Sequence, residues 1–270
     1  MADLILTGAS RGIGHALARA LAGQRGDRLI LVARDWARLD TLVTAIEQKG
    51  GHAIAVPADL SSLAGARALG QRLAELVTPG ATLVHNAGLW PSKRVLTPDG
   101  LETAFVVNHL APLVMQRALL DAGRLRRIMV VGAGAMVKGH FDAARTPTGA
   151  DFSSIRTYCN AKLCFALAMR DVAAAHPAID VVVVHPGVVR TDLGARPGPI
   201  GWILSLVKRG WEAPEVCAER LVRILARERW SPPGQARWLM EENEQPWPAV
   251  AEDEATRRAV RDTTARLLAS

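Results

Sequence analysis

Six short aliphatic segments occur along the chain, and none of them alternates between apolar and polar residues. Segments of this kind are typical of strands that are buried on both faces of a parallel sheet. The strands that this pattern predicts are Leu4–Thr7, Leu29–Ala33, Ala53–Val56, Thr82–His85, Ile128–Val131 and Val181–His185.

Longer segments rich in Ala, Leu and Arg separate these strands and repeat their apolar positions with a helical period. This alternation predicts an α/β fold, a doubly wound parallel sheet with helices on both faces. No internal repeat or low-complexity linker divides the chain, so we expect a single domain over residues 1–270. The predicted helices are His15–Arg25, Ala37–Lys49, Leu63–Leu76, Leu101–Ala122 and Ile155–Ala175.

Proline and glycine are concentrated in two later segments, Arg196–Gly201 and Ser231–Gly234. A lid over a site, around residues 190–213, would explain the first segment, and a loop into a last strand would explain the second. Ordinary surface loops are the alternative for both.

The composition is that of a globular protein, since 49% of the 270 residues are hydrophobic and 22% are charged. The formal net charge of +7 could indicate a nucleic-acid partner. However, the basic residues are scattered, only five of them are lysines, and no basic run is interleaved with aromatic residues. We therefore expect no nucleic-acid binding.

The chain shows no sign of export. It starts without the basic and apolar regions of a signal peptide, and no apolar run is long enough to span a bilayer. Cys159, Cys164 and Cys217 lack the spacing of a metal site and cannot all pair with one another. Reduced thiols are typical of the cytoplasm, so we expect a cytoplasmic protein with no metal and no membrane anchor.

The first predicted strand ends in a glycine-rich turn, Thr7–Gly14, that leads into a helix. Gly8, Gly12 and Gly14 allow a tight turn and a close approach of the backbone to a pyrophosphate at the helix N-terminus. A chance cluster of glycines is the alternative, but the place of the turn after the first strand favours a dinucleotide site.

The only tyrosine, Tyr158, precedes Lys162 by four residues, so the two side chains share one face of a helix. A neighbouring ammonium group favours the phenolate and lowers the pKa of the phenol, which is about 10 in a free side chain. A phenol with a lowered pKa transfers protons near neutral pH. A tyrosine ring packed on a lysine stem is the plainer alternative.

Together with four further motifs, these features have the order and spacing of one family. From residue 3 to about residue 192 the chain resembles the short-chain dehydrogenases/reductases. Finer features at Thr97–Gly100, Val107–Leu110 and His185–Thr191 are similar to the retinol-dehydrogenase-like branch. The four further motifs are Asp59-Leu60, Asn86-Ala87-Gly88, Asn108 and Pro186-Gly187.

The resemblance implies a Rossmann fold and assigns roles to single residues. Tyr158 would exchange a proton with the substrate oxygen, Lys162 would bind the nicotinamide ribose, and Asn108 would hold a water connected to Lys162. A position on the helix surface is the alternative for Asn108, and a solvated loop position is the alternative for Asp59 as a ligand of the adenine. The residues assigned to the cofactor are Gly8, Ser10, Arg11, Gly12, Ile13, Gly14, Arg34, Asp59, Leu60, Asn86, Ala87, Gly88, Tyr158, Lys162, Pro186, Gly187, Val189 and Thr191.

The end of the second predicted strand favours NADP(H) over NAD(H). NAD-specific relatives place an acidic residue there, whereas this chain has Ala33 followed by Arg34, with Arg11 in the glycine-rich turn. Two guanidinium groups suit a 2′-phosphate. Asp35 would weaken this prediction if the strand ended one residue later.

One position departs from the family pattern, because Ala133 stands where the catalytic serine normally follows the fifth strand. No serine lies between Ser92 and Ser153, and nothing indicates that Thr146 or Thr148 folds back to replace it. Loss of one such hydrogen-bond donor typically lowers the rate by about 10²–10³-fold. We expect an impaired or adapted enzyme, with partly decayed function as the alternative.

The substrate pocket is less well defined by the sequence. Small residues at 132–135 leave room for a bulky substrate, or for one that brings its own hydroxyl or amine. Tryptophans lie where relatives line this pocket, although they could equally pack a lid onto the body. His140 could replace the proton donor, but an ordinary surface histidine is the alternative. The residues assigned to the pocket are Trp90, Ala133, Met136 and Trp202, with Trp211 in the lid.

We therefore expect an NADP(H)-dependent oxidoreductase that interconverts a carbonyl and an alcohol on a small, rather apolar molecule. An NADP-binding scaffold or sensor with little turnover is one alternative, and imine or cyclisation-linked reduction is another. By resemblance alone, a homo-oligomer would form through helices 101–122 and 155–175. The tail from Pro214 resembles the closing helix, last strand and terminal helix of the branch, with a solvated acidic turn at Glu241–Glu244.

Overall fold

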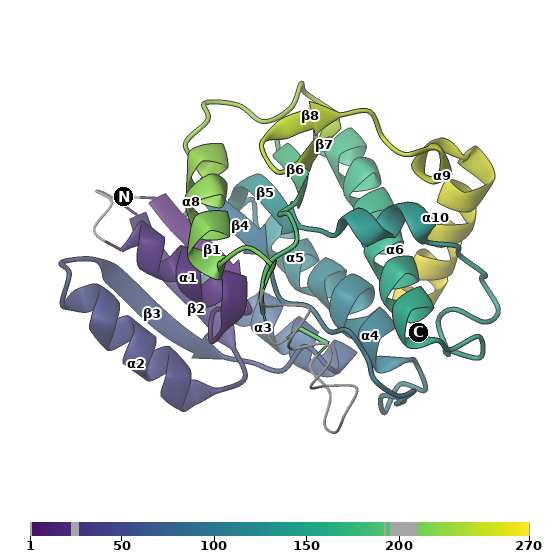
Figure 1. Ribbon diagram of the computed structural model, residues 1–270, viewed down its shortest axis with the longest axis horizontal. Coiled ribbons are helices and arrows are strands. Elements are labelled where there is room, and N and C mark those ends of the chain that lie inside the picture. The colour runs from purple at the N-terminus through teal and green to yellow at the C-terminus, as the bar shows by residue number, and fades with distance from the viewer. Residues whose placement is uncertain (1, 23–26, 192, 195–209, 270) are drawn as a thin grey trace.

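The computed structural model describes residues 2–22, 27–191, 193–194 and 210–269. Within these residues an eight-stranded sheet runs in the order β3-β2-β1-β4-β5-β6-β7-β8 (Figure 1). Strands β1 to β7 are parallel, and β8 is antiparallel to β7. The strands are β1 (Ala2–Thr7), β2 (Asp27–Ala33), β3 (His52–Pro57), β4 (Ala81–His85), β5 (Leu125–Val131), β6 (Asp180–His185), β7 (Ala236–Met240) and β8 (Asn243–Gln245).

The predicted fold class is confirmed, and each of the six predicted strands lies within an observed one. The strands lack alternation because both faces of the sheet are covered. In β6, for example, Val181 and Val183 belong to one hydrophobic cluster, whereas Val182 and Val184 belong to the other. Successive side chains of a strand point to opposite faces, so every position of such a strand must be apolar.

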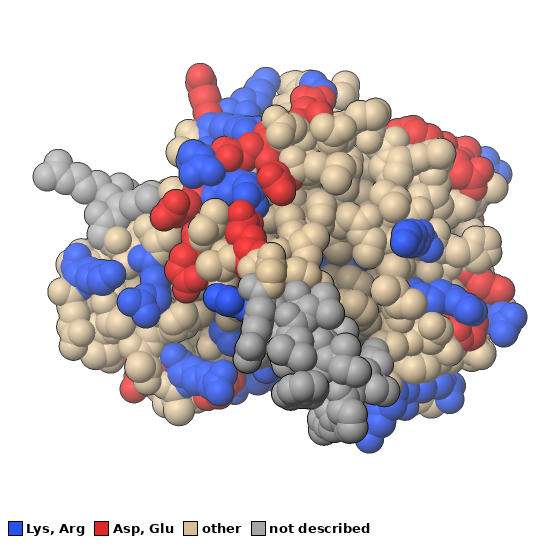
Figure 2. All heavy atoms as spheres, in the orientation of Figure 1, with Lys and Arg blue, Asp and Glu red and all other residues tan. Residues whose placement is uncertain are grey.

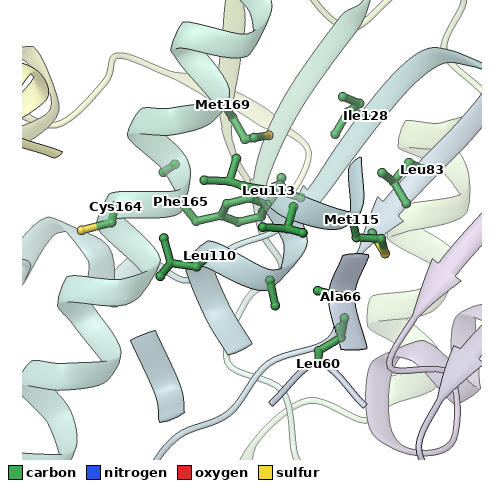
Figure 3. Packing of buried hydrophobic residues seen from close by; sticks show 14 of the residues in the cluster. Leu60, Ala66, Leu83, Leu110, Leu113, Met115, Ile128, Cys164, Phe165 and Met169 are labelled. Carbon is green, nitrogen blue, oxygen red and sulfur yellow. The ribbon is translucent and has the colours of Figure 1, made fainter. Parts of the chain in front are cut away.

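Two groups of helices supply these two clusters. Phe165 and Met169 of one group lie beside Leu110 and Leu113 on the same side of the sheet (Figure 3). The first group is α1 (Gly12–Leu21), α2 (Trp36–Glu47) and α8 (Pro214–Leu225), and the second is α3 (Leu63–Leu76), α5 (Ala111–Asp121) and α6 (Ser154–Ala175).

The strand order of the sheet reverses between β1 and β4, which are neighbours in the sheet although β2 and β3 lie between them in the sequence. Ligands of such sheets bind at this switch point.

The helix predicted over residues 101–122 is present from Thr103 to Asp121, but it is not a regular α-helix throughout. It consists of a short helix α4 (Thr103–Phe105), a π-helical turn (Val106–Leu110) and α5. Asn108 lies in the π-helical turn and is buried, which excludes the surface position. Its side chain accepts a hydrogen bond from Leu89 N at 2.8 Å and donates one to Leu89 O at 2.7 Å. Turns of this kind are frequent at functional sites.

The closing helix, last strand and terminal helix predicted for the tail are present as α8, β7 and α10 (Glu254–Ala269), with a short helix α9 (Ala249–Glu252) before α10. The predicted solvated acidic turn is confirmed in part, because Glu241, Asn243 and Glu244 are exposed, while its carboxylates also bind arginines. Glu242 binds Arg223 through two hydrogen bonds, and Glu244 pairs with Arg237. The hairpin of β7 and β8 brings these carboxylates onto neighbouring arginines.

The C-terminal helices lie at the opposite end of the molecule from α2 and pack on α6 (Figure 1). Arg257 and Arg261 of α10 lie 3.8 and 3.9 Å from Asp171, and Thr264 forms a 2.8 Å hydrogen bond with His109. Part of the surface on which an oligomer was expected is therefore covered by the chain's own terminal helix.

Candidate functional site

A cavity of about 490 Å³ opens along the carboxyl ends of the parallel strands. It collects most of the residues that the sequence assigned to a cofactor and a substrate, although they come from the loops after six strands, from α1 and α6, and from the segment before α8. From the sequence predictions it contains Gly8, Ser10, Arg11, Gly12, Ile13, Arg34, Asp59, Leu60, Asn86, Ala87, Gly88, Trp90, Ala133, Tyr158, Lys162, Pro186, Gly187, Val189, Thr191 and Trp211.

The glycine-rich turn is packed too closely for side chains. Gly8 has a φ of +71°, and a Cβ there would lie 2.8 Å from Ala87 Cα. A Cβ on Gly14 would lie 2.3 Å from Gly8 O. Gly14 is therefore not part of the cavity wall but lets α1 approach the turn. Asn86 fixes this contact by donating from Nδ2 to Thr7 O at 2.9 Å and to Gly8 O at 3.2 Å.

The N-terminus of α1 faces the cavity. Its cap residue, Arg11, makes no side-chain capping bond, and the first turn of the helix holds no acidic residue. Unpaired N–H groups and the positive end of the helix dipole suit an anion such as a pyrophosphate. Arg11 and Arg34 add two exposed guanidinium groups to the same wall. The residues present therefore fit a dinucleotide whose pyrophosphate lies at the helix N-terminus and which carries a further phosphate near the two guanidinium groups.

The acidic residues near the ends of β2 and β3 have local partners. Strand β2 ends at Ala33 as the sequence predicts, and Asp35 caps α2 by accepting a hydrogen bond from Arg38 N at 3.1 Å. Asp35 does not line the cavity. Asp59 lines it and accepts hydrogen bonds from the Ser61 N–H at 3.0 Å and the Ser61 hydroxyl at 2.8 Å.

Tyr158 and Lys162 lie on one face of α6, as predicted, and both are buried in the cavity wall. The ring of Trp90 stacks on the ring of Tyr158, with 5.3 Å between centroids and an interplanar angle of 17°. Lys162 Nζ donates to Val131 O at 3.2 Å and lies 5.9 Å from the centroid of the tyrosine ring. The ammonium group is therefore held by the end of β5.

Burial changes the acidity of both groups in opposite directions. It raises the pKa of Tyr158 above its ordinary value and lowers the pKa of Lys162 to about 8. The predicted lowering of the tyrosine pKa by Lys162 is thus wrong in this structure. The reason is that loss of water around the phenol, under the ring of Trp90, disfavours the phenolate, while the ammonium group is bound to a carbonyl.

The wall beyond β5 is formed by small residues at 132–135, in accord with the space expected there. A Cβ on Gly134 would lie 2.9 Å from His185 Nε2, so this part of the wall packs on the histidine ring. Neither threonine considered as a replacement hydroxyl lies in the wall. The Thr146 hydroxyl accepts a hydrogen bond from Asp142 N, and the Thr148 hydroxyl donates to Arg145 O, both within their own loop.

The assignment of Met136 to the pocket is wrong, because Met136 is fully buried in the hydrophobic core and does not line the cavity. His140 is exposed and lies outside the cavity wall, which agrees with an ordinary surface histidine and not with a replacement donor. Trp202 and most of the expected lid lie outside the described residues.

Sequence reasoning missed part of the apolar wall. Leu89 follows the Asn-Ala-Gly motif directly, and Thr103 and Val107 are four residues apart and face the cavity together. The position of Leu89 next to the motif and the spacing of Thr103 and Val107 could both have been read from the sequence, since residues four apart on a helix share a face. The stacking of Trp90 on Tyr158 had no local signal.

The described residues hold neither a metal-type cluster of side chains nor a membrane-spanning helix. No three His, Cys, Asp or Glu side chains gather there in a way that could hold a metal ion. Likewise, no helix in the described ranges has the length and apolar character needed to cross a bilayer.

Comparisons with known proteins agree with this geometry. A family model described as short chain dehydrogenase matches residues 3–198. Human retinol dehydrogenase 13 is 32% identical over 231 residues, covering 80% of this chain and 69% of that protein. Mouse polyprenol dehydrogenase is 32% identical over 272 residues, covering 94% and 80%. A short chain dehydrogenase from Burkholderia cenocepacia J2315, solved in complex with NADP, has the same fold, with a TM-score of 0.66 and 24% identity over 88% of this chain and 96% of that one.

The pKa of Tyr158 can be measured directly because the protein has one tyrosine. We expect the ultraviolet band of the phenolate to appear in the native protein only above about pH 10, the value of a free phenol, and near that value in denaturant. Since burial sets the direction of this pKa shift, we expect Lys162→Met to leave the native titration high. A native pKa below that of the denatured chain, with circular dichroism unchanged, would contradict this.

Proposed function

We propose that this chain, which belongs to the short-chain dehydrogenase/reductase family, is an NADP(H)-dependent oxidoreductase that interconverts a carbonyl and an alcohol on a small, rather apolar molecule. One observation carries the proposal. The open N-terminus of α1 and the Tyr158–Lys162 pair line the same cavity at the switch point of the sheet. A dinucleotide bound across that point would extend from the first group to the second.

NADP(H) is the cofactor that the cavity fits better. Arg11 and Arg34 line the wall beside the end of β2 and suit a 2′-phosphate. Asp35, the acid that would repel it, caps α2 outside the wall. The Burkholderia structure, which was solved in complex with NADP, supports the same choice. NAD(H) is the less favoured alternative.

A bound nicotinamide would supply or accept the hydride. The chain's part is proton transfer and orientation. Tyr158, with its raised pKa, holds its proton at neutral pH and therefore suits the donor role toward a carbonyl oxygen. Lys162 brings a positive charge to the ribose side, and Val131 O fixes its direction. Asn108 holds Leu89 at the edge of the wall through two hydrogen bonds. We also propose that Asn108 holds a water that is connected to Lys162.

Ala133 lines the cavity, and we propose that it occupies the position of the family's catalytic serine. Without that hydroxyl, the substrate oxygen has one donor fewer as charge develops on it. The enzyme would then be slow, or its substrate would bring a hydroxyl or amine of its own. The absence of this hydroxyl at Ala133 is also the reason for the two alternatives. One is a cofactor-bound scaffold or sensor, and the other is an imine or cyclisation-linked reductase.

The substrate side of the cavity is apolar. Leu89, Trp90, Val107 and Trp211 contribute to the cavity wall, and Trp90 stacks on Tyr158. The relatives named above are dehydrogenases of retinol and of polyprenol. We therefore propose a rather apolar carbonyl or alcohol as the substrate class for this chain.

Three further parts of the proposal rest on the resemblance or the sequence. These are a single cofactor-binding domain with a lid around residues 190–213, a cytoplasmic location, and a homo-oligomer through helices 101–122 and 155–175. For the oligomer we expect light scattering to give a multiple of the 28.9 kDa chain mass. A monomer mass at all concentrations would contradict the oligomer. The covering of α6 by α10 would then be the structural reason.

Ala133→Ser should restore the missing donor. We expect its kcat for reduction of a panel of apolar ketones and aldehydes with NADPH to exceed that of the wild type by up to about 10²-fold. Ala135→Ser is the matched control, since it adds a hydroxyl to the same wall two residues further on. An equal effect of both substitutions, or none from Ala133→Ser in an active protein, would contradict the assignment of Ala133.

Tyr158→Phe tests the proton role in the same assay. We expect turnover to be lost while NADPH binding remains, because only the hydroxyl is removed and the stacking on Trp90 is kept. Unchanged turnover would remove Tyr158 from the mechanism. Tight NADPH binding without turnover in the wild type and in both alanine-to-serine variants would favour the scaffold or sensor.

A further inference from the structure

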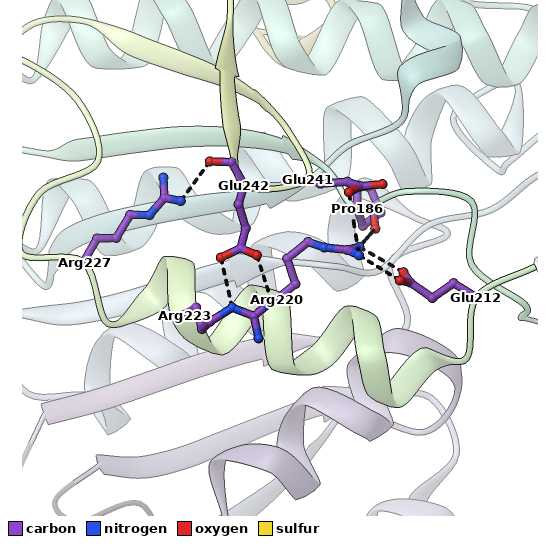
Figure 4. A network of polar contacts seen from close by, with 7 residues as sticks. All are labelled: Pro186, Glu212, Arg220, Arg223, Arg227, Glu241 and Glu242. Atoms are coloured by element: carbon purple, nitrogen blue, oxygen red, sulfur yellow. Dashed lines mark hydrogen bonds and ion pairs between the residues drawn. The ribbon is translucent and has the colours of Figure 1, made fainter.

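A guanidinium group outside the cavity binds the turn that forms one of its walls. Arg220 of α8 has a side chain that is only 10% exposed. Its Nη1 donates to Pro186 O at 2.8 Å and to Glu212 Oε2 at 2.9 Å, and its Nη2 donates to Glu212 Oε1 at 2.7 Å (Figure 4). One planar side chain thus joins the end of β6 to Glu212.

Glu212 is itself tied to the segment that follows this turn. Its backbone N–H donates to Val188 O at 3.1 Å, and its carbonyl accepts from Arg190 N at 2.8 Å. Glu241 joins the cluster from the β7–β8 turn, where its N–H donates to His185 O at 2.7 Å and its carboxylate lies 3.7 Å from Arg220. The residues on both sides of Pro186 and Gly187 are therefore held by partners of Arg220.

The guanidinium group lies directly behind Gly187. This residue has a φ of +91°, and a Cβ on it would lie 3.2 Å from Arg220 Nη1 and 3.2 Å from Glu241 Oε1. Pro186, Gly187 and Val189 line the cavity, whereas Arg220 does not. The turn is thus one layer thick between the cavity and the charged cluster. Acidic and basic side chains are interleaved on the surface over α8 and the adjoining hairpin (Figure 2).

We propose that Arg220 is a positioning residue that fixes the Pro186–Gly187 turn and, through it, the nicotinamide half of the cofactor. This inference rests on the proposed function. Arginine suits the task because its fork can bond a carbonyl and a carboxylate at once, whereas the ammonium group of lysine acts as a point charge. The loops after β1, β2 and β3 form the other end of the cavity and have no hydrogen bond to Arg220 among the described contacts. The adenine half should therefore bind independently of it.

Titrations with two ligands separate these halves. NADPH contains both, and 2′,5′-ADP represents the adenine half alone. For Arg220→Gln and Arg220→Lys we expect NADPH to bind about tenfold more weakly, the size of one lost charge-assisted hydrogen bond, while the affinity for 2′,5′-ADP stays at the wild-type value. Turnover should fall by up to about 10²-fold, the cost of a misplaced reacting group.

Arg223→Gln is the matched control. Arg223 lies three residues further along α8, is 57% exposed, and makes two hydrogen bonds to Glu242 without touching Pro186. We expect it to change neither affinity. If Arg220→Gln does not fold, Arg220→Lys keeps the positive charge, and Glu212→Gln removes one charge but keeps an acceptor for Arg220.

The outcomes are distinct. Equal weakening of both ligands in the folded variants would show a general loss of structure and overturn the positioning role, as would unchanged binding of both. A wild-type protein that binds neither NADPH nor NADH would overturn the proposed function and this inference with it. Selective loss of NADPH affinity supports both.

Discussion

The carboxamide of Asn86 joins the two loops on which the site depends. It donates to the carbonyls of Thr7 and Gly8, while the Thr7 hydroxyl accepts hydrogen bonds from the N–H groups of Asn86 and Ala87, each at 3.0 Å. These bonds connect the loops after β1 and β4, the strands between which the sheet reverses its order. The contact is so close that no side chain fits at Gly8 or Gly14. As a consequence, α1 begins beside the end of the sheet with its N-terminus toward the cavity.

A second constraint is the burial of ionisable groups at the other end of the cavity. Water is excluded from Tyr158 by its stacking on Trp90, and from Lys162 by its place between α6 and β5. Burial disfavours the charged form of each group, so the pKa of the acid rises and that of the base falls. Shifts of this kind are concentrated at functional sites. The protein holds the pair in place with a carbonyl, an aromatic ring and a helix rather than with a direct bond between them.

Local and periodic signals in the sequence predicted much of this structure. The six strands follow from unbroken aliphatic runs. The glycine-rich turn and the Tyr158–Lys162 spacing identified residues at the two ends of the cavity. Contacts between distant segments escaped prediction. Trp90 covers Tyr158 and reverses the expected pKa shift, Met136 turns into the core, and the hairpin after β7 brings Glu242 onto Arg223. The bond from Arg220 to Pro186 depends on α8 packing on the face of the sheet that carries Val182 and Val184 of β6, which no local pattern encodes.

The proposed binding of NADP(H), with its 2′-phosphate at Arg34, can be measured by calorimetric titration of NADPH and NADH into the wild type, Arg34→Ala and Arg38→Ala. Arg38 is the control, because it pairs with Asp35 outside the cavity wall. We expect the wild type to prefer NADPH and Arg34→Ala to weaken NADPH binding by about tenfold or more, while NADH binding and the control stay unchanged. Preference for NADH, or no binding of either dinucleotide, would contradict the proposed binding.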